Sequence, residues 1–166
     1  TGSLALGAGA RATETNAIAL GTGAEASGTG SLAFGAGSKA TATNAAAFGT
    51  GASATGENSL ALGAGSTASE KGSVAIGGQS NSAGENAIAI GFGACAASKN
   101  SFVLGAGAKA VGENAGAIGH SALTNGEDAM AVGVKANATG QYAFALGTSA
   151  CAVNVGAIAI GTFAVA

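Results

Sequence analysis

Ser73-Val74-Ala75-Ile76-Gly77 is one of twelve closely similar phrases that recur every fourteen residues along this 166-residue chain. The phrase begins at residues 3, 17, 31, 45, 59, 73, 87, 101, 115, 129, 143 and 157, with no insertion or deletion between copies. A fixed period of this kind indicates one structural unit stacked along an axis. The sequence therefore predicts a single repeat domain over residues 1–166, made of twelve repeats of which the last is incomplete.

The composition excludes several common classes of protein. Glycine supplies 31 residues, proline and tryptophan are absent, and 8% of residues are charged. Glycine interrupts every apolar run well before the roughly 18 residues that a membrane-spanning helix needs. Disordered chains are rich in charge and poor in apolar residues, and nucleic-acid binding needs basic patches, which a net charge of −2 does not favour. Because there is no initiator methionine, signal peptide or capping repeat, we expect a fragment of a longer protein.

The first half of each repeat alternates small and large residues. Counting from the Ser or Ala that opens the phrase, position three is Ala in every repeat except one, where it is Val103. Positions two and four are large and apolar, with Ala46 and Gly116 as the gaps. This alternation predicts a β-strand. Since neither face carries charge, both faces are expected to be buried.

The second half of the repeat predicts another short strand and two turns. Positions eight and ten are nearly always Ala or Ser, whereas position nine varies from Arg11 to Val165. Gly-x-Gly marks the first turn in most repeats. Asn, Asp or Gly at position fourteen indicates a second turn with positive φ there, with Tyr142 as an exception. Two strands and two turns in fourteen residues predict one coil of an all-β parallel β-roll.

One such roll leaves an apolar strand face uncovered, which predicts an oligomer. We favour positions one, three, five, eight and ten facing the narrow interior, with positions two and four facing the oligomer axis. The opposite register, with large residues inside and alanine at the interface, stays open. The side chains expected at the axis are Leu4, Leu6, Ile18, Leu20, Leu32, Phe34, Leu60, Leu62, Val74, Ile76, Ile88, Ile90, Phe102, Leu104, Ile118, Met130, Val132, Phe144, Leu146, Ile158 and Ile160.

Two stretches carry a resemblance to a known family. Residues 58–66, Asn-Ser-Leu-Ala-Leu-Gly-Ala-Gly-Ser, and residues 72–80, Gly-Ser-Val-Ala-Ile-Gly-Gly-Gln-Ser, resemble the Asn-Ser-Val-Ala-Ile-Gly-x-x-Ser motif of YadA-like heads. These heads belong to the trimeric autotransporter adhesins of Gram-negative bacteria. The resemblance extends over essentially the whole chain, in twelve copies that share one register.

The resemblance implies a left-handed parallel β-roll, or β-solenoid, assembled as a homotrimer on the bacterial surface. It also implies binding to host extracellular-matrix proteins such as collagen, fibronectin or laminin, or to host cells. The full-length protein would be anchored in the outer membrane, but this fragment lacks the stalk and anchor of the family. Arg11, Glu25, Lys39 and Lys109 at position nine are the possible ligand-facing residues of the outer strand.

Catalysis, cofactors and metals find little support in the sequence. His120 is the one histidine, and a surface turn explains it more simply than a catalytic site does. The Gly-x-Gly pairs lack the Gly-Lys-Ser/Thr ending of a phosphate loop. Cys95 and Cys151 lie four coils apart, about 19 Å at roughly 4.8 Å per coil, which is too far for a disulfide. We expect no enzyme, no cofactor and no metal site.

Position thirteen carries charges of both signs, in the order Glu57, Lys71, Glu85, Lys99, Glu113 and Glu127. We expect neighbouring coils to attract through this ladder. Three functions remain open: an adhesive head, a structural spacer that holds another binding tip, and, more remotely, an ice-binding solenoid. Thr13-Glu14-Thr15 and Thr41-Ala42-Thr43 resemble the Thr-x-Thr arrays of ice-binding solenoids, but the charged ladder interrupts that pattern.

Overall fold

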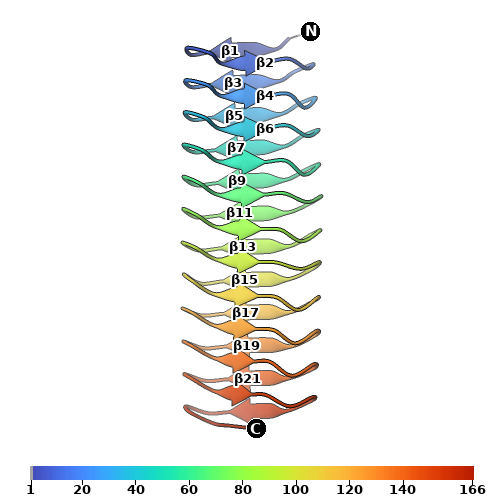
Figure 1. Cartoon of the computed structure of the whole chain (residues 1–166), viewed down its shortest axis with the longest axis vertical. Helices are drawn as coiled ribbons and strands as arrows, with labels where there is room; N and C mark the ends of the chain where they lie inside the picture. The colour runs from blue at the N-terminus through green and yellow to red at the C-terminus, as the bar shows by residue number, and fades with distance from the viewer. Residues whose placement is uncertain (1) are drawn as a thin grey trace.

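The computed structural model describes residues 2–166, which form strands and turns stacked into a rod (Figure 1). Each repeat contributes a strand at positions two to four and a shorter strand at positions nine and ten. The chain climbs from one end of the rod to the other without reversing, so the two termini lie at opposite ends. The result is an all-β parallel β-solenoid of about eleven complete turns. Over the described residues, the structure contains no helix that could cross a membrane.

The odd-numbered strands form one continuous parallel sheet, which we call sheet A. Residues fourteen apart are paired along it, as Val74 is with Ile88. Its strands are β1 (Leu4–Leu6), β3 (Ile18–Leu20), β5 (Leu32–Phe34), β7 (Ala46–Phe48), β9 (Leu60–Leu62), β11 (Val74–Ile76), β13 (Ile88–Ile90), β15 (Phe102–Leu104), β17 (Gly116–Ile118), β19 (Met130–Val132), β21 (Phe144–Leu146) and β23 (Ile158–Ile160).

The even-numbered strands form a second parallel sheet, sheet B, with the same offset of fourteen residues. Its strands are β2 (Arg11–Ala12), β4 (Glu25–Ala26), β6 (Lys39–Ala40), β8 (Ser53–Ala54), β10 (Thr67–Ala68), β12 (Asn81–Ser82), β14 (Cys95–Ala96), β16 (Lys109–Ala110), β18 (Leu123–Thr124), β20 (Asn137–Ala138) and β22 (Cys151–Ala152). A single bridge from Cys151 to Val165 continues the sheet beyond β22.

Alanine columns fill the narrow space between the two sheets. The inward residues at positions one, three, eight and ten are fully buried in nearly every coil, as Ala87, Ala89, Ala94 and Ala96 show. Val103 is the largest of the fully buried side chains. Small residues therefore face the interior, and the alternative register with large residues inside does not occur.

Several buried hydroxyl groups find acceptors among the backbone carbonyls. At position eight, the Oγ atoms of Ser38, Ser66 and Ser80 each donate a hydrogen bond of 2.8 Å to the position-five carbonyl of the same coil. Thr124 replaces alanine at position ten and donates to the carbonyl of Gly116, also at 2.8 Å. Most of the buried serine and threonine hydroxyls thus find a partner in this interior, whereas the buried Oγ of Ser59 has none.

Two β-turns close each coil and form the two lateral edges of the rod (Figure 1). In the first turn the position-eight N–H donates to the position-five carbonyl, and in the second the position-one N–H donates to the position-twelve carbonyl. The third residue of either turn, at position seven or fourteen, has φ between 54° and 69°. This geometry fits a type II turn. Positive φ at position fourteen is confirmed, and Tyr142, with φ 60°, follows the same rule.

The prediction that position five faces the interior is wrong. These glycines lie at the corner that opens the first turn, partly exposed in most coils, with φ between 121° and 148°. A Cβ placed on Gly91 would stand 2.6 Å from the carbonyl oxygen of Gly105 in the next coil. Glycine is required here because the backbone of the neighbouring coil occupies the space of a side chain.

Candidate functional site

Apolar side chains cover the outer face of sheet A along the whole rod. We call this surface the apolar stripe; it consists of the outward side chains at positions two and four from Leu4 to Ile160. All the residues expected at an oligomer axis lie on it. Most are half-buried by their neighbours in adjacent coils, whereas Leu62 and Leu104 are each 43% exposed. In the single chain, therefore, the stripe is open to solvent.

Phe48 also belongs to the apolar stripe, although it was not among the axial residues predicted from the sequence. Its ring stacks on that of Phe34, with the ring centroids 5.1 Å apart. The fourteen-residue register was sufficient to find it, since Phe48 occupies position four. Ala46 and Gly116 remain the two places where the stripe lacks a large side chain.

The outer face of sheet B is mixed in character. Arg11, Glu25 and Lys39 lie on adjacent strands in register, so the structure brings these three predicted ligand-facing residues together. Lys109 lies several coils away, beside Cys95 and Leu123. Arg11, Lys39 and Lys109 are exposed and Glu25 is half-buried. No ion pair joins these residues in the described part of the chain.

The charges at position thirteen form pairs rather than a continuous ladder. The ammonium group of Lys71 lies 3.8 Å from the carboxylate of Glu57, and Lys99 lies at the same distance from Glu85. Each lysine thus pairs with the glutamate of the preceding coil and not with that of the following one. The expected attraction between neighbours is confirmed at these two steps only.

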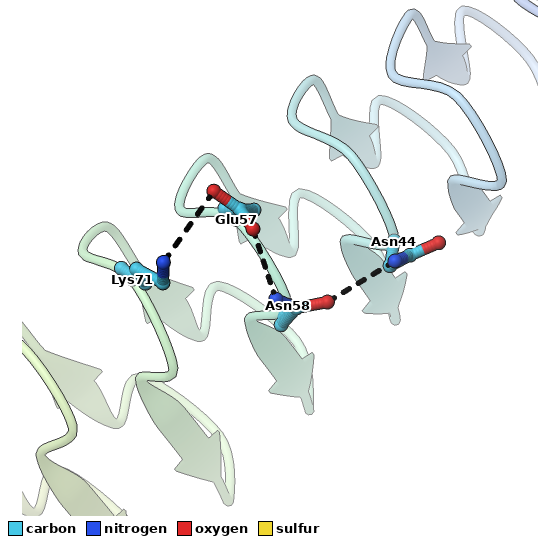
Figure 2. Close-up of polar contacts among 4 residues, drawn as sticks. All are labelled: Asn44, Glu57, Asn58 and Lys71. Carbon is cyan, nitrogen blue, oxygen red and sulfur yellow. Dashed lines mark hydrogen bonds and ion pairs between the residues drawn. The ribbon is translucent and has the colours of Figure 1, made fainter.

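Asparagines at position fourteen link the coils beside those charges. Figure 2 shows Asn44 donating to Asn58 at 3.1 Å, Asn58 donating to Glu57 at 3.2 Å, and Glu57 paired with Lys71. The same contact joins Asn100 to Asn114 at 3.0 Å. This ladder was not predicted from the sequence, although asparagine at the same position of successive repeats was the signal that could have revealed it.

The first-turn edge changes character along the rod. Up to the repeat that begins at Ser59 it carries Gly-Ala-Gly or Gly-Thr-Gly, and no large side chain projects from it. Further along, position seven carries a non-glycine residue with positive φ in most repeats, among them Gln79, Ser121 and Lys135. At position six, Phe92 is 63% exposed and Val134 is 45% exposed. The prediction of a glycine-rich first turn did not include this change.

The residues weighed for other chemistry lie apart from one another. Cys95 and Cys151 are free and half-buried on sheet B. His120 is exposed on the first-turn edge, where its Nδ1 lies 3.3 Å from the Oγ of Ser121. Across residues 2–166 we find no group of three or more His, Cys, Asp or Glu side chains arranged to hold a metal ion, and no pocket.

Comparison with known proteins connects this geometry to a family. Among curated proteins, no match to the chain is found. The family described as the YadA head domain repeat (2 copies) matches residues 1–24, 26–52, 54–80, 68–94 and 125–150. These segments cover well over half of the chain and follow the repeat that builds the solenoid. The chain therefore belongs to the YadA head domain family.

Proposed function

We propose that this chain is the head of a trimeric adhesin displayed on the surface of a Gram-negative bacterium. Three left-handed rolls enclose a common axis with their apolar stripes, and their outer faces bind host matrix proteins or host cells. The apolar stripe, in a chain built of YadA head repeats, is the observation that carries this proposal.

The energetics of the stripe favour assembly. Soluble monomers rarely expose apolar patches of more than roughly 300–600 Å², and this stripe follows all twelve strands of sheet A. Full burial of one Val, Leu, Ile or Phe side chain is worth about 1.5–3 kcal/mol. Covering some twenty half-exposed side chains per chain therefore amounts to a free energy on the order of 20 kcal/mol before the entropic cost of association.

Ligand binding is assigned to the surface that faces outward when sheet A faces the axis. This surface comprises sheet B, including Arg11, Lys39 and Lys109, and the adjoining turns. It offers many weak contacts rather than one enclosed site, so a long fibrous ligand would touch several coils or several chains. Affinity would then come from multivalency. We propose a binding role without catalysis and without a cofactor.

The first experiment tests the assembly. Ile90→Asp would place three carboxylates at the axis of the trimer, and an unpaired buried charge costs several kcal/mol. We expect light scattering of the purified variant to show loss of the trimer. Lys39→Asp, on the outer face of sheet B, is the matched control and should leave the trimer intact. A stable folded monomer of the parent chain at micromolar concentration would refute the assembly.

The second experiment tests the ligand. The purified trimer is applied to a panel of immobilised matrix proteins, with a stalk fragment of a trimeric adhesin as the control. Saturable binding to one or more of them supports the adhesive role. Binding no greater than that of the stalk fragment across the panel and on host cells would favour a structural spacer instead.

A further inference from the structure

Charge is divided unequally around each coil. Seven of the eight carboxylates lie at positions twelve to fourteen, on the second-turn edge, together with two lysines. The other four cations lie on sheet B or in the first turn, and the remaining carboxylate, Glu25, lies on sheet B. The second-turn edge thus has a formal charge of −5 and the rest of the coil surface +3, which matches the net charge of −2. The carboxylates of the second-turn edge are Glu14, Glu57, Glu70, Glu85, Glu113, Glu127 and Asp128.

Several of these charges have no counter-ion within their own chain. The two ion pairs found in residues 2–166 join Glu57 to Lys71 and Glu85 to Lys99. Further along, Glu113, Glu127 and Asp128 are exposed on the second-turn edge, and Lys135 is exposed on the first-turn edge. Hydrogen bonds reach two of these acids, from Asn114 to Asp128 at 3.0 Å and from Gln141 to Glu127 at 3.2 Å, but both donors are neutral.

The first-turn edge is strained at the same height. Ser121 and Lys135 both hold φ at 56°, at a position where earlier coils use glycine. A non-glycine residue in this conformation carries backbone strain. Val134, next to Lys135, is 45% exposed although it is apolar. No ion pair to Lys135 is found within residues 2–166.

The proposed trimer brings opposite edges together. In a closed ring of identical chains whose contacts are head-to-tail, one edge of each chain meets the other edge of the next. With the stripes turned inward, the first-turn edge of one chain therefore lies beside the second-turn edge of its neighbour. Because a coil is fourteen residues long, a first-turn residue lies at a height midway between the second-turn residues seven before and seven after it.

This rule aligns the unpaired charges. Lys135 lies level with the interval between Asp128 and Tyr142 of the neighbouring chain. His120 lies level with the interval between Glu113 and Glu127. By the same count, the exposed ring of Phe92 faces the Glu85–Lys99 ion pair, where it would be covered. Lys135, which forms no ion pair within residues 2–166, thus meets carboxylates that also form none there.

We propose that these residues form a lateral seam between neighbouring chains that sets the axial register of the trimer. The proposal rests on the trimeric assembly proposed above. The apolar stripe repeats in every coil, so it distinguishes poorly between aligned chains and chains displaced by fourteen residues. The seam occurs once along the rod. If the neighbouring chain is displaced by one coil in one direction, Lys135 lies between Tyr142 and Gly156 of that chain, away from the three carboxylates. Polar contacts of this kind are well suited to fixing register.

Cross-linking tests the seam directly. Lys135→Cys and Asp128→Cys are introduced together in a chain that also carries Cys95→Ser and Cys151→Ser. A short bis-maleimide linker is added, and a denaturing gel should show covalent trimers, because each chain supplies one thiol to each neighbour. Within one chain the two sites lie on opposite edges, separated by about five extended residues or roughly 16 Å, and a link between them would leave the chain monomeric on the gel.

The matched control moves one thiol to the outer face of the same coil. Asn137→Cys with Asp128→Cys, in the same background, should give no covalent trimer. If light scattering shows intact trimers but Lys135→Cys with Asp128→Cys links no better than this control, the seam is overturned and the trimer stands. If the parent chain is a monomer, both proposals fail.

Charge reversal provides an independent readout. Lys135→Glu places a carboxylate opposite Asp128 and should raise the concentration at which half the trimer dissociates by tenfold or more. Asp128→Asn should recover part of this loss, because Asn occupies position fourteen in other coils with the same positive φ. Additive effects of the two changes would show that the residues do not interact and would overturn the seam.

Discussion

At the scale of single residues, the first turn contains two kinds of glycine that differ in what fixes them. At position five, the neighbouring coil occupies the space that a Cβ would need. At position seven, the turn requires positive φ but leaves the surrounding space open, as at Gly93, where a Cβ would meet no atom within 4 Å. Stacking therefore fixes the first kind, and backbone conformation alone favours the second.

Two substitutions separate these causes. Gly93→Ala, where φ is 63°, should lower the free energy of unfolding by about 1 kcal/mol, the cost of the left-handed conformation. Gly91→Ala adds a backbone collision and should cost at least ~3 kcal/mol, as changes that force the backbone to shift do. Urea unfolding followed by circular dichroism measures both losses. Equal losses would show that the neighbouring coil yields easily at position five.

At the scale of the strand, side-chain volume decides which face is turned inward. The two sheets approach closely enough that alanine fills the space between them, whereas leucine, isoleucine and phenylalanine are confined to the outer face of sheet A. An interior so narrow contributes little apolar burial per coil. The backbone hydrogen bonds between coils and the covering of the apolar stripe must therefore supply much of the stability.

Changing alanine to leucine on either face of sheet A tests this difference between the inner and the outer face. Ala89→Leu enlarges a fully buried position and should cost about 3 kcal/mol through overpacking. Ala46→Leu adds the same atoms to the apolar stripe, between Leu32 and Leu60, and should change stability by less than ~1 kcal/mol. Thermal unfolding of the two variants provides the comparison. Tolerance of leucine at position 89 would contradict the narrow interior.

The sequence predicted this level of structure well for a physical reason. Strand alternation and positive φ at Asn or Gly depend on neighbouring residues, and twelve copies of the same pattern reinforce each prediction. The position of Gly63 and its equivalents at the corner was mispredicted, because alternation alone does not show where a strand ends and a turn begins. The pairing of Lys71 with Glu57 rather than Glu85 depends on the direction of a long side chain, which no periodicity encodes.

At the scale of the whole molecule, the surface divides into regions that run parallel to the rod axis. The apolar stripe lies on sheet A, the acidic edge follows the second turns, and sheet B carries a mixed polar face. Each of these three regions comes from one to three positions of the repeat, so every added coil extends the same kind of surface. A multivalent ligand would gain contacts with every added coil.

The hydrogen bonds between coils give the rod a mechanical property. Bonds such as that from Gly77 N–H to the carbonyl of Leu62 join successive coils along the long axis. Tension applied between the two ends of the rod passes through every coil boundary in series, and the boundaries open one after another. Each coil that opens releases fourteen residues, about 46 Å of extended chain. Pulling a single chain in a force spectrometer should therefore give a series of equal extension steps, and one abrupt rupture of the whole rod would contradict this picture.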